Sequence, residues 1–250
     1  MKTISEFSIL IAIVTFGIFA TLQSSDAQVG TTPFISIPSQ SQIEDLAGGL
    51  GITVPSGIRP IVPLAPELIM AFEGWRPSPY DDPSGYCTVG FGHLLKKAEC
   101  SSLDLSGYAR PLTKREGATL LEADTRTARS AAQRLVRKEL KDHEFGAISA
   151  FIFNIGKGNF AESTLLALIN DGQFEAASKE FGKWVVSKGK VLPGLVARRA
   201  CEAAMFRDFV KANSAGEFVR NDCESLGAAP GSGTLIDVDT GQEVQTSEGR

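Results

Sequence analysis

The chain has 250 residues, enough for one or two domains, and its 43% hydrophobic and 22% charged residues exclude a disordered or collagen-like protein. The formal net charge is −4, so the charge of the whole chain does not favour nucleic acid, and no such partner is expected. The charge is uneven, because residues 63–223 hold 22 Lys and Arg against 20 Asp and Glu, whereas residues 224–250 hold one Arg against five acidic residues.

The N-terminus has the pattern of an export signal. Lys2 precedes an apolar run over residues 7–22, and the small residues Ser25 and Ala27 fit the positions that signal peptidase reads. A run of 16 residues is shorter than the roughly 20 that a membrane-spanning helix needs. We therefore predict a signal peptide over residues 1–27, with a releasable, uncleaved anchor as the alternative. The protein is expected to be secreted or periplasmic and to meet the membrane only through this segment.

Residues 28–62 are rich in Ser, Thr, Gly, Pro and Gln, which is typical of a flexible linker. The composition changes at Pro63. A short helix is predicted over residues 67–72, with Pro66 near its start and Gly74 just past its end. Residues 75–95 combine Tyr, Thr, Val and Phe with Pro and Gly, a pattern that predicts a small antiparallel sheet with tight turns.

The chain from there to residue 210 is predicted to be helical. Thr113 and Glu116 form the pattern of a capping box, which starts a helix that is expected to continue to Leu135. Residues 145–155 are almost wholly apolar but too few to cross a membrane, so this helix is expected at the buried centre of the fold. Further helices are predicted over 163–169, 174–186 and 195–210. Residues 224–250 show no apolar face and are expected to form a disordered acidic tail.

The chain has four cysteines, Cys87, Cys100, Cys201 and Cys223. An even number behind an export signal permits two disulfides. Of the three possible pairings, proximity in the sequence favours Cys87 with Cys100 and Cys201 with Cys223, and free buried thiols are the alternative. No CxxC motif occurs and no histidine stands at a ligand spacing from a cysteine pair, so no metal site is expected.

Two carboxylates occupy different predicted settings within residues 73–95. Glu73 ends the short helix, Asp82 lies nine residues later among turns, and Thr88 follows after six more. Cleavage of a glycosidic bond requires one carboxyl group that stays protonated and another that stays ionised. Apolar packing favours the acid form of a helix-end Glu, whereas an Asp on a solvated hairpin stays charged. Asp81 is the competing candidate for the second carboxylate.

This segment resembles the catalytic region of the phage-type lysozymes, glycoside hydrolase family 24, which includes the lambdoid endolysins. The matching pattern consists of Glu73-Gly74, Tyr80, Asp82, Thr88, Gly90, Gly92 and His93. Further matches follow in the family's order: Pro111-Leu112-Thr113, Phe153-Asn154-Ile155-Gly156, Ser163-Thr164-Leu165-Leu166, Trp184, and Gly194-Leu195 with Arg198-Arg199, Glu202 and Phe206. The resemblance covers roughly residues 63–210, and its strength lies in the ordered set of motifs.

The resemblance implies an α+β, lysozyme-like fold, in which a small antiparallel β-sheet lobe and a mainly helical lobe flank a cleft, within a catalytic domain over residues 63–223. It implies a muramidase that hydrolyses the β-1,4 bonds between N-acetylmuramic acid and N-acetylglucosamine in bacterial peptidoglycan. The family usually inverts the configuration at the reacting carbon. No cofactor is implied, and we expect a monomer.

Residue by residue, the resemblance implies Glu73 as the general acid, Asp82 as the second catalytic carboxylate, and Thr88 as a residue that helps to hold the attacking water. The family spacing from Glu73 selects Asp82 over Asp81. Positions that line the family's substrate cleft match Leu94, Phe153 and Ser163. His93 matches a structural residue that is tied to a carboxylate, and the sequence does not identify that partner.

Two other functions remain open. A lytic transglycosylase needs only the Glu, and a catalytically inactive protein would only bind or anchor to the wall. The intact set of Glu73, Asp82 and Thr88 argues against both. Arg198 and Arg199 have the chemistry to bind the wall's carboxylates, but salt bridges within their own helix are the favoured interpretation.

Overall fold

The computed structural model describes residues 57–62, 64–82, 85–214, 218–226 and 234–244. All of them belong to one compact unit. The predicted signal peptide and all but the last six residues of the predicted linker lie outside the described residues. Within the described ranges, no helix has the length and apolar character needed to cross a membrane.

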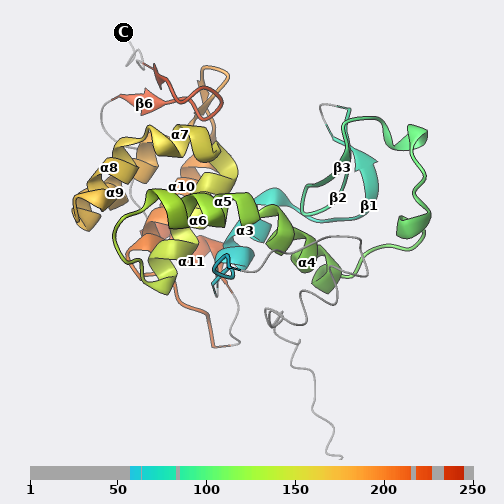
Figure 1. Ribbon diagram of the computed structural model, residues 1–250, viewed down its shortest axis with the longest axis horizontal. Coiled ribbons are helices and arrows are strands. Elements are labelled where there is room, and N and C mark those ends of the chain that lie inside the picture. The colour runs from blue at the N-terminus through green and yellow to red at the C-terminus, as the bar shows by residue number, and fades with distance from the viewer. Residues whose placement is uncertain (1–56, 63, 83–84, 215–217, 227–233, 245–250) are drawn as a thin grey trace, which may run out of the picture. The chain divides into compact units, whose positions relative to one another are not determined.

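The fold combines helices with small antiparallel sheets, which confirms the predicted α+β class. In Figure 1 the sheet β1–β3 lies on the right, most helices lie on the left, and α3 and α4 lie between them. The elements in chain order are α3 (Ala65–Glu73), β1 (Arg76–Asp81), β2 (Cys87–Gly90), β3 (His93–Lys96), the 3-10 helices η2 (Cys100–Ser102) and η3 (Ser106–Tyr108), α4 (Lys114–Asp124), α5 (Arg126–Leu135), α6 (Asp142–Ile155), α7 (Lys157–Ala161), α8 (Thr164–Asn170), α9 (Phe174–Glu180), η4 (Phe181–Lys183), β4 (Val186–Ser187), β5 (Lys190–Val191), α10 (Pro193–Phe206), α11 (Arg220–Leu226), β6 (Leu235–Ile236) and β7 (Glu243–Val244).

The first sheet has the strand order β1-β2-β3 and is antiparallel throughout. Its register pairs Thr88 with Tyr80 on one side and with Leu94 on the other. A turn joins β2 to β3, and Gly90 and Gly92 adopt φ values of 71° and 85°, which favour glycine. The sheet predicted over residues 75–95 is thereby confirmed.

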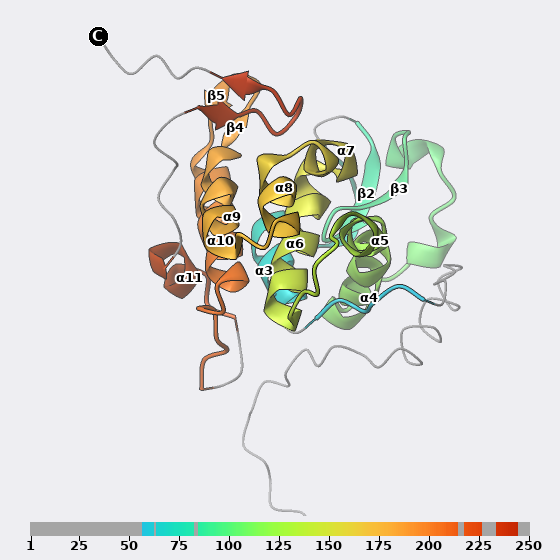
Figure 2. The same cartoon turned by 60° about the vertical axis from the view of Figure 1, so that its left-hand side comes forward.

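Helix α6 lies at the centre of the main core, as its sequence predicts. All of its apolar residues except the half-buried Phe153 are buried, and it packs against α3, α5 and α10 (Figure 2). Phe151 contacts the rings of Phe160, Phe181 and Trp184 in T-shaped, edge-to-face arrangements. A helix with apolar residues all round is stable only in such a buried position.

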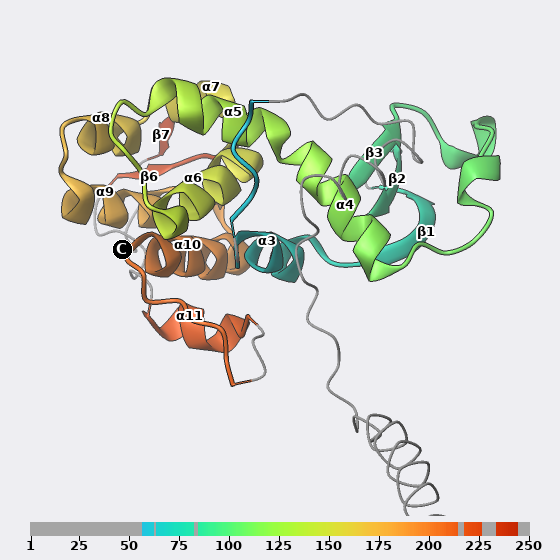
Figure 3. The ribbon, with the colours of Figure 1, turned by 60° about the horizontal axis from the view of Figure 1, so that its bottom comes forward.

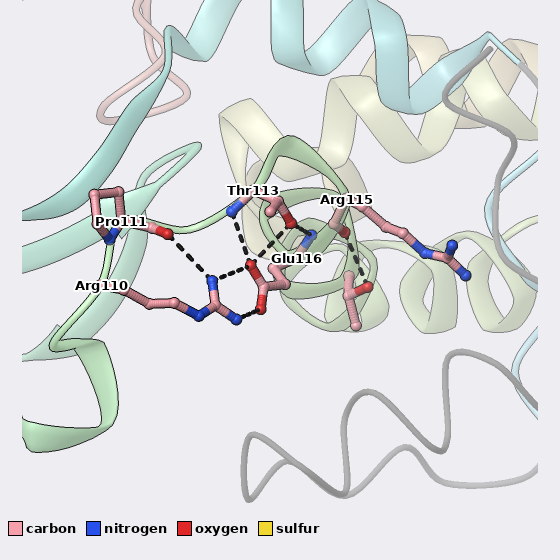
Figure 4. A network of polar contacts seen from close by, with 6 residues as sticks. Arg110, Pro111, Thr113, Arg115 and Glu116 are labelled. Carbon is pink, nitrogen blue, oxygen red and sulfur yellow. Dashed lines mark hydrogen bonds and ion pairs between the residues drawn. The ribbon is translucent and has the colours of Figure 1, made fainter. Parts of the chain in front are cut away.

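The capping box predicted at the start of α4 is present, and Figure 4 shows the polar contacts around it. The Thr113 hydroxyl accepts from the amide of Glu116 at 3.2 Å, and the Glu116 carboxylate accepts from the amide of Thr113 at 2.8 Å. Arg110 adds an ion pair to the same carboxylate. Together with the bonds from Thr113, this arginine lowers the pKa of Glu116 to about 2.

The predicted helices differ from the observed ones most in two places, whereas the helix predicted over 195–210 spans Pro193–Phe206. One helix was expected to run to Leu135, but it is divided at Thr125, and the buried ion pair between Glu122 and Arg129 (2.7 Å) joins the two parts. The helix predicted over 174–186 ends at Glu180, because the chain then passes through η4 and buries Trp184 before it enters β4. In both places, tertiary contacts override a local helical pattern.

The end of the predicted linker is packed rather than free. Ile61 and Val62 are buried in the main core. Arg59 donates to the carbonyl of Leu140 at 3.0 Å and lies over the ring of Phe145. The folded part of the chain therefore starts before Pro63, since apolar residues on α6 and its neighbours bury these side chains.

Residues 234–244 form the hairpin β6–β7, which differs from the disordered tail that was expected there. Leu235 is buried with Val185 and Val186, and the amide of Val238 donates to the carbonyl of Val186 at 2.8 Å. Figure 2 shows this hairpin beside β4 and β5. The segment has too few apolar residues to fold alone, but β4 supplies the apolar surface that it lacks.

Two disulfides are present, Cys87–Cys100 and Cys201–Cys223, which are the pairings that proximity favoured. The first connects β2 to η2, and the second connects α10 to α11. The described residues contain no free cysteine.

Candidate active site

Glu73 lies at the junction of a helix and the sheet. It is the last residue of α3, whose apolar residues Leu68 and Ile69 are buried in the main core and fix the helix. Gly74 ends the helix with φ 73°, and β1 begins two residues later. The Glu73 side chain is 27% exposed, so its carboxyl group is fixed by the fold and still accessible to solvent.

A buried arginine holds Glu73. Nη1 of Arg198 on α10 donates to Oε1 of Glu73 at 2.6 Å. Figure 3 shows α10 between α6 and α11, with α3 beside it. A carboxylate–guanidinium bond of this kind is stronger than a neutral hydrogen bond, and it fixes the orientation of the carboxyl group.

The same arginine belongs to a larger ion network. Nε of Arg198 donates to Glu202 Oε1 at 3.1 Å, and Arg199 Nη1 lies 3.2 Å from Glu202 Oε2. Arg199 also donates to Oδ1 of Asn154 on α6 at 2.6 Å. The positive charges of two guanidinium groups are thus paired with two carboxyl groups. Buried charges require such pairing, because an unpaired charge in the interior is strongly destabilising.

Burial and charge act in opposite directions on these groups. Burial raises the pKa of Glu202, and the positive charges of Arg199 and Arg198 counteract this rise. Burial lowers the pKa of Arg199 to about 10. For Arg198, burial is outweighed by Glu202 and Glu73, so its pKa is raised and it stays charged.

Asp82 and Asp81 have different surroundings. Asp82 lies just after β1, where its Oδ1 accepts from the amide of Tyr86 at 3.0 Å and shapes the turn to β2. Asp81 is exposed, and its Oδ1 accepts from the amide of Cys100 at 2.7 Å. The carboxylate of Asp81 therefore braces the segment that carries the first disulfide.

Thr88 is in the middle strand of the sheet. Its side chain is buried, with 4% of the residue exposed, and its hydroxyl donates to the carbonyl of Tyr80 at 3.3 Å. Leu94 pairs with it across β2 and β3 and is 42% exposed. The hairpin thus brings Thr88, Leu94 and the turn with Asp82 together.

The other predicted substrate residues lie in the helical part. Phe153 on α6 is half-buried against the main core. Ser163 is the N-cap of α8, where its hydroxyl accepts from the amide of Leu166 at 3.1 Å and donates to the carbonyl of Phe160 at 2.7 Å. The structure therefore gives Ser163 a capping role at the start of α8.

His93 has the carboxylate partner that the sequence left unidentified. Its Nδ1 lies 2.9 Å and 3.0 Å from the two carboxylate oxygens of Asp124 at the end of α4. This contact joins β3 to α4 above a small apolar cluster of Val89, Leu112 and Leu120. His93 thereby fixes the sheet to the helix that follows it.

Sequence reasoning missed the bond between Arg198 and Glu73. The pattern of Arg198, Arg199 and Glu202 predicts pairs within one helix, and these pairs are present. The link to Glu73 spans 125 positions, and no local pattern signals it.

One group of metal-ligand residue types occurs in the part of the chain that the structure describes, namely Asp81, Cys87 and Cys100. The two sulfur atoms are bonded to each other in a disulfide and are not thiolate ligands.

The comparisons with known proteins agree with this fold. The phage lysozyme family model matches residues 70–202, more than half of the chain, so the chain belongs to the phage lysozyme family. The endolysin of Salmonella phage P22 is 36% identical over 134 residues, which cover 54% of this chain and 88% of the relative.

The endolysin of Bacillus phage B103 is 32% identical over 142 residues, which cover 56% of this chain and 51% of the relative, so the chain spans about half the length of that endolysin. Among solved structures, a P22 lysozyme mutant is 31% identical with a TM-score of 0.53, and the match covers 60% of this chain and 99% of the other. The lysozyme-like fold is thereby confirmed.

Proposed function

We propose that this protein is a muramidase that hydrolyses the β-1,4 bonds between N-acetylmuramic acid and N-acetylglucosamine in bacterial peptidoglycan. Glu73 is the general acid that protonates the leaving oxygen. Asp82 and Thr88 position the water that attacks from the other side of the sugar. No metal or cofactor takes part in this proposal.

The observation that carries the proposal is the setting of Glu73. It ends a helix fixed in the core, its side chain is partly exposed, and a buried arginine orients its carboxyl group. A catalytic group must be accessible to substrate and held in one geometry. Membership of the phage lysozyme family supports the substrate class.

The sheet residues support the second part of the proposal. Asp82 lies on the turn of the hairpin that contains Thr88, whereas the Asp81 carboxylate accepts a hydrogen bond from the amide of Cys100 and braces that segment. An inverting glycosidase uses its second carboxylate as a base for water. Two disulfides also suit an oxidising compartment, which supports the prediction of a secreted or periplasmic protein.

The first experiment is digestion of purified peptidoglycan with residues 28–250 and mass spectrometry of the soluble fragments. A hydrated, reducing muramic acid end supports the proposal. An anhydro end would instead make the protein a lytic transglycosylase, and the absence of fragments from a folded, oxidised sample would leave a wall-binding protein.

Matched variants then assign the residues. Glu73→Gln preserves shape and removes the proton that is donated, so we expect a loss of at least about 10³-fold. Asp82→Asn is expected to lose at least about 10²-fold. Asp81→Asn, its neighbour, should stay within about threefold of wild type. An equal loss in both aspartate variants would contradict the assignment of Asp82.

A further inference from the structure

Arg198 is shared between two carboxyl groups. Nη1 donates to Glu73 at 2.6 Å and Nε donates to Glu202 at 3.1 Å. The guanidinium plane is rigid, so fixing Nε at one carboxylate also fixes where Nη1 points. Glu202 therefore helps to decide the position of the donor that orients Glu73.

Glu202 is itself held from the other side. It is 0% exposed, and Arg199 Nη1 lies 3.2 Å from its second oxygen, while Asn154 on α6 accepts from Nη2 of Arg199. Glu202 thus lies between two arginines of its own helix, and one of them is bonded to α6.

The charges that act on Glu202 are those of Arg199, Arg198 and Glu73. From the packed helices, α6 contributes the neutral Asn154. The nearest cation on α11 is Arg220, which lies over the ring of Phe72 and pairs with Glu224. Glu202 is thus the one carboxylate besides Glu73 that neutralises Arg198 in the described residues.

This sharing resolves a conflict in the proposed chemistry. An arginine beside a carboxyl group favours the charged form, whereas a general acid must carry a proton. A second carboxylate on the same arginine offsets part of its positive charge. Glu202 thus shares the charge of the arginine that orients Glu73.

We propose that Glu202 is a positioning residue for the reaction, which holds Arg198 in place and offsets its charge so that Glu73 remains able to donate a proton. The inference rests on the proposed function of Glu73 as the general acid. It assigns to Glu202 a role beyond its salt bridges with Arg198 and Arg199 on the same helix.

The test compares pH profiles of kcat/KM on soluble glycan strands. In Glu202→Gln the shape is kept and the charge is lost, so the basic limb of the profile is expected to move to lower pH by about one unit. Glu122→Gln is the matched control, because Glu122 is also buried and paired with an arginine, at 2.7 Å, but lies on α4. Its basic limb should stay in place even if its melting temperature falls.

A folded Glu202→Gln variant with an unmoved limb and wild-type kcat would overturn the proposal. Loss of Glu202 alone leaves two buried arginines against one carboxylate, so a second variant, Arg199→Met with Glu202→Met, removes one charge of each sign together with the acceptor of Arg198 Nε. In it Arg198 loses its anchor, and we expect kcat to fall at least about tenfold while KM stays within about twofold. Wild-type kcat in this variant would equally refute the positioning role.

The wild-type digestion separates this inference from the function on which it rests. Without reducing-end release by the wild type, the proposed function fails before any variant is compared. With that release established and abolished in Glu73→Gln, an unchanged Glu202 variant contradicts the positioning role alone.

Discussion

Replacement of Asp237 by Ala tests whether the C-terminal hairpin is part of the stable fold. Asp237 is 7% exposed, and its carboxylate accepts from the amide of Gly189 at 3.1 Å and from the amide of Asp239 at 2.8 Å. The first bond holds the turn between β4 and β5, and the second holds the hairpin's own turn. The substitution removes both acceptors and leaves the amides of Gly189 and Asp239 without these bonds.

The magnitude follows from these two bonds. A hydrogen bond to a charged group contributes about 1.5 kcal/mol or more, so the loss is about 3 kcal/mol. For a folded unit of this size, each kcal/mol changes Tm by about 2–4 °C, which gives a decrease of about 6–12 °C. Asp239→Ala is the control, because that residue is exposed and water replaces its bonds to Ser187 and Lys188, so about 1 kcal/mol is expected.

The assay is thermal unfolding by circular dichroism for the wild type, both variants and a chain that ends at Leu226. The decrease in Tm of the shortened chain is the upper limit for Asp237→Ala, since this substitution cannot remove more stability than the whole hairpin contributes. A shortened chain that melts with the wild type would refute the reasoning, because the hairpin would then add nothing to the stability of the helices.

Three further predictions concern local features. Glu116→Gln should lower the free energy of unfolding by about 1 kcal/mol at pH 7. The pKa of Glu116 in the folded protein lies below the unfolded value of 4.5, so this difference should be complete above pH 4.5 and should vanish as the pH falls through about 2. Urea titrations at several pH values would measure it. Gly146→Ala should cost about 1–2 kcal/mol in the same assay, because a Cβ there would lie 2.6 Å from Val62 Cγ2, and an unchanged midpoint would show that the linker end does not pack on α6. Replacement of Cys201 and Cys223 by Ala should cost about 3 kcal/mol, since the bridge closes a loop across 22 positions, and equal stability of the variant and the oxidised wild type would contradict this.

The features that the sequence predicts well depend on local or periodic patterns. The capping box at Thr113 needs only residues three positions apart. The central helix is recognised because residues 145–155 are almost wholly apolar, and such a helix is stable only when it is buried. The pairing of nearby cysteines and the sheet around Thr88 likewise follow from short spacings.

The features that it misses depend on contacts between distant segments. The hairpin of residues 234–244 has a polar composition, and its order comes from β4 and from Asn159, which donates to the carbonyl of Val238 at 3.0 Å. The bond between Arg198 and Glu73 is of the same kind. Sequence patterns identified Glu73 through its family motif, but only the folded arrangement of α3 and α10 shows what holds it.

Helix α10 connects the C-terminal hairpin with Glu73, yet we expect their variants to behave differently. The hairpin holds the turn of β4 and β5, and α10 begins two residues after β5. The helix is also fixed by packing on α3 and α6 and by the disulfide to α11. Loosening of the hairpin should therefore leave the bond from Arg198 to Glu73 in place.

Asp237→Ala is accordingly expected to lower Tm while its kcat at 25 °C stays within about twofold of wild type, whereas Glu202→Gln is expected to change the pH profile. The measurement is the rate of reducing-end release at 25 °C, well below both midpoints. A kcat that falls in step with Tm in Asp237→Ala would mean that the hairpin, and not the packing of α10, fixes the position of Arg198.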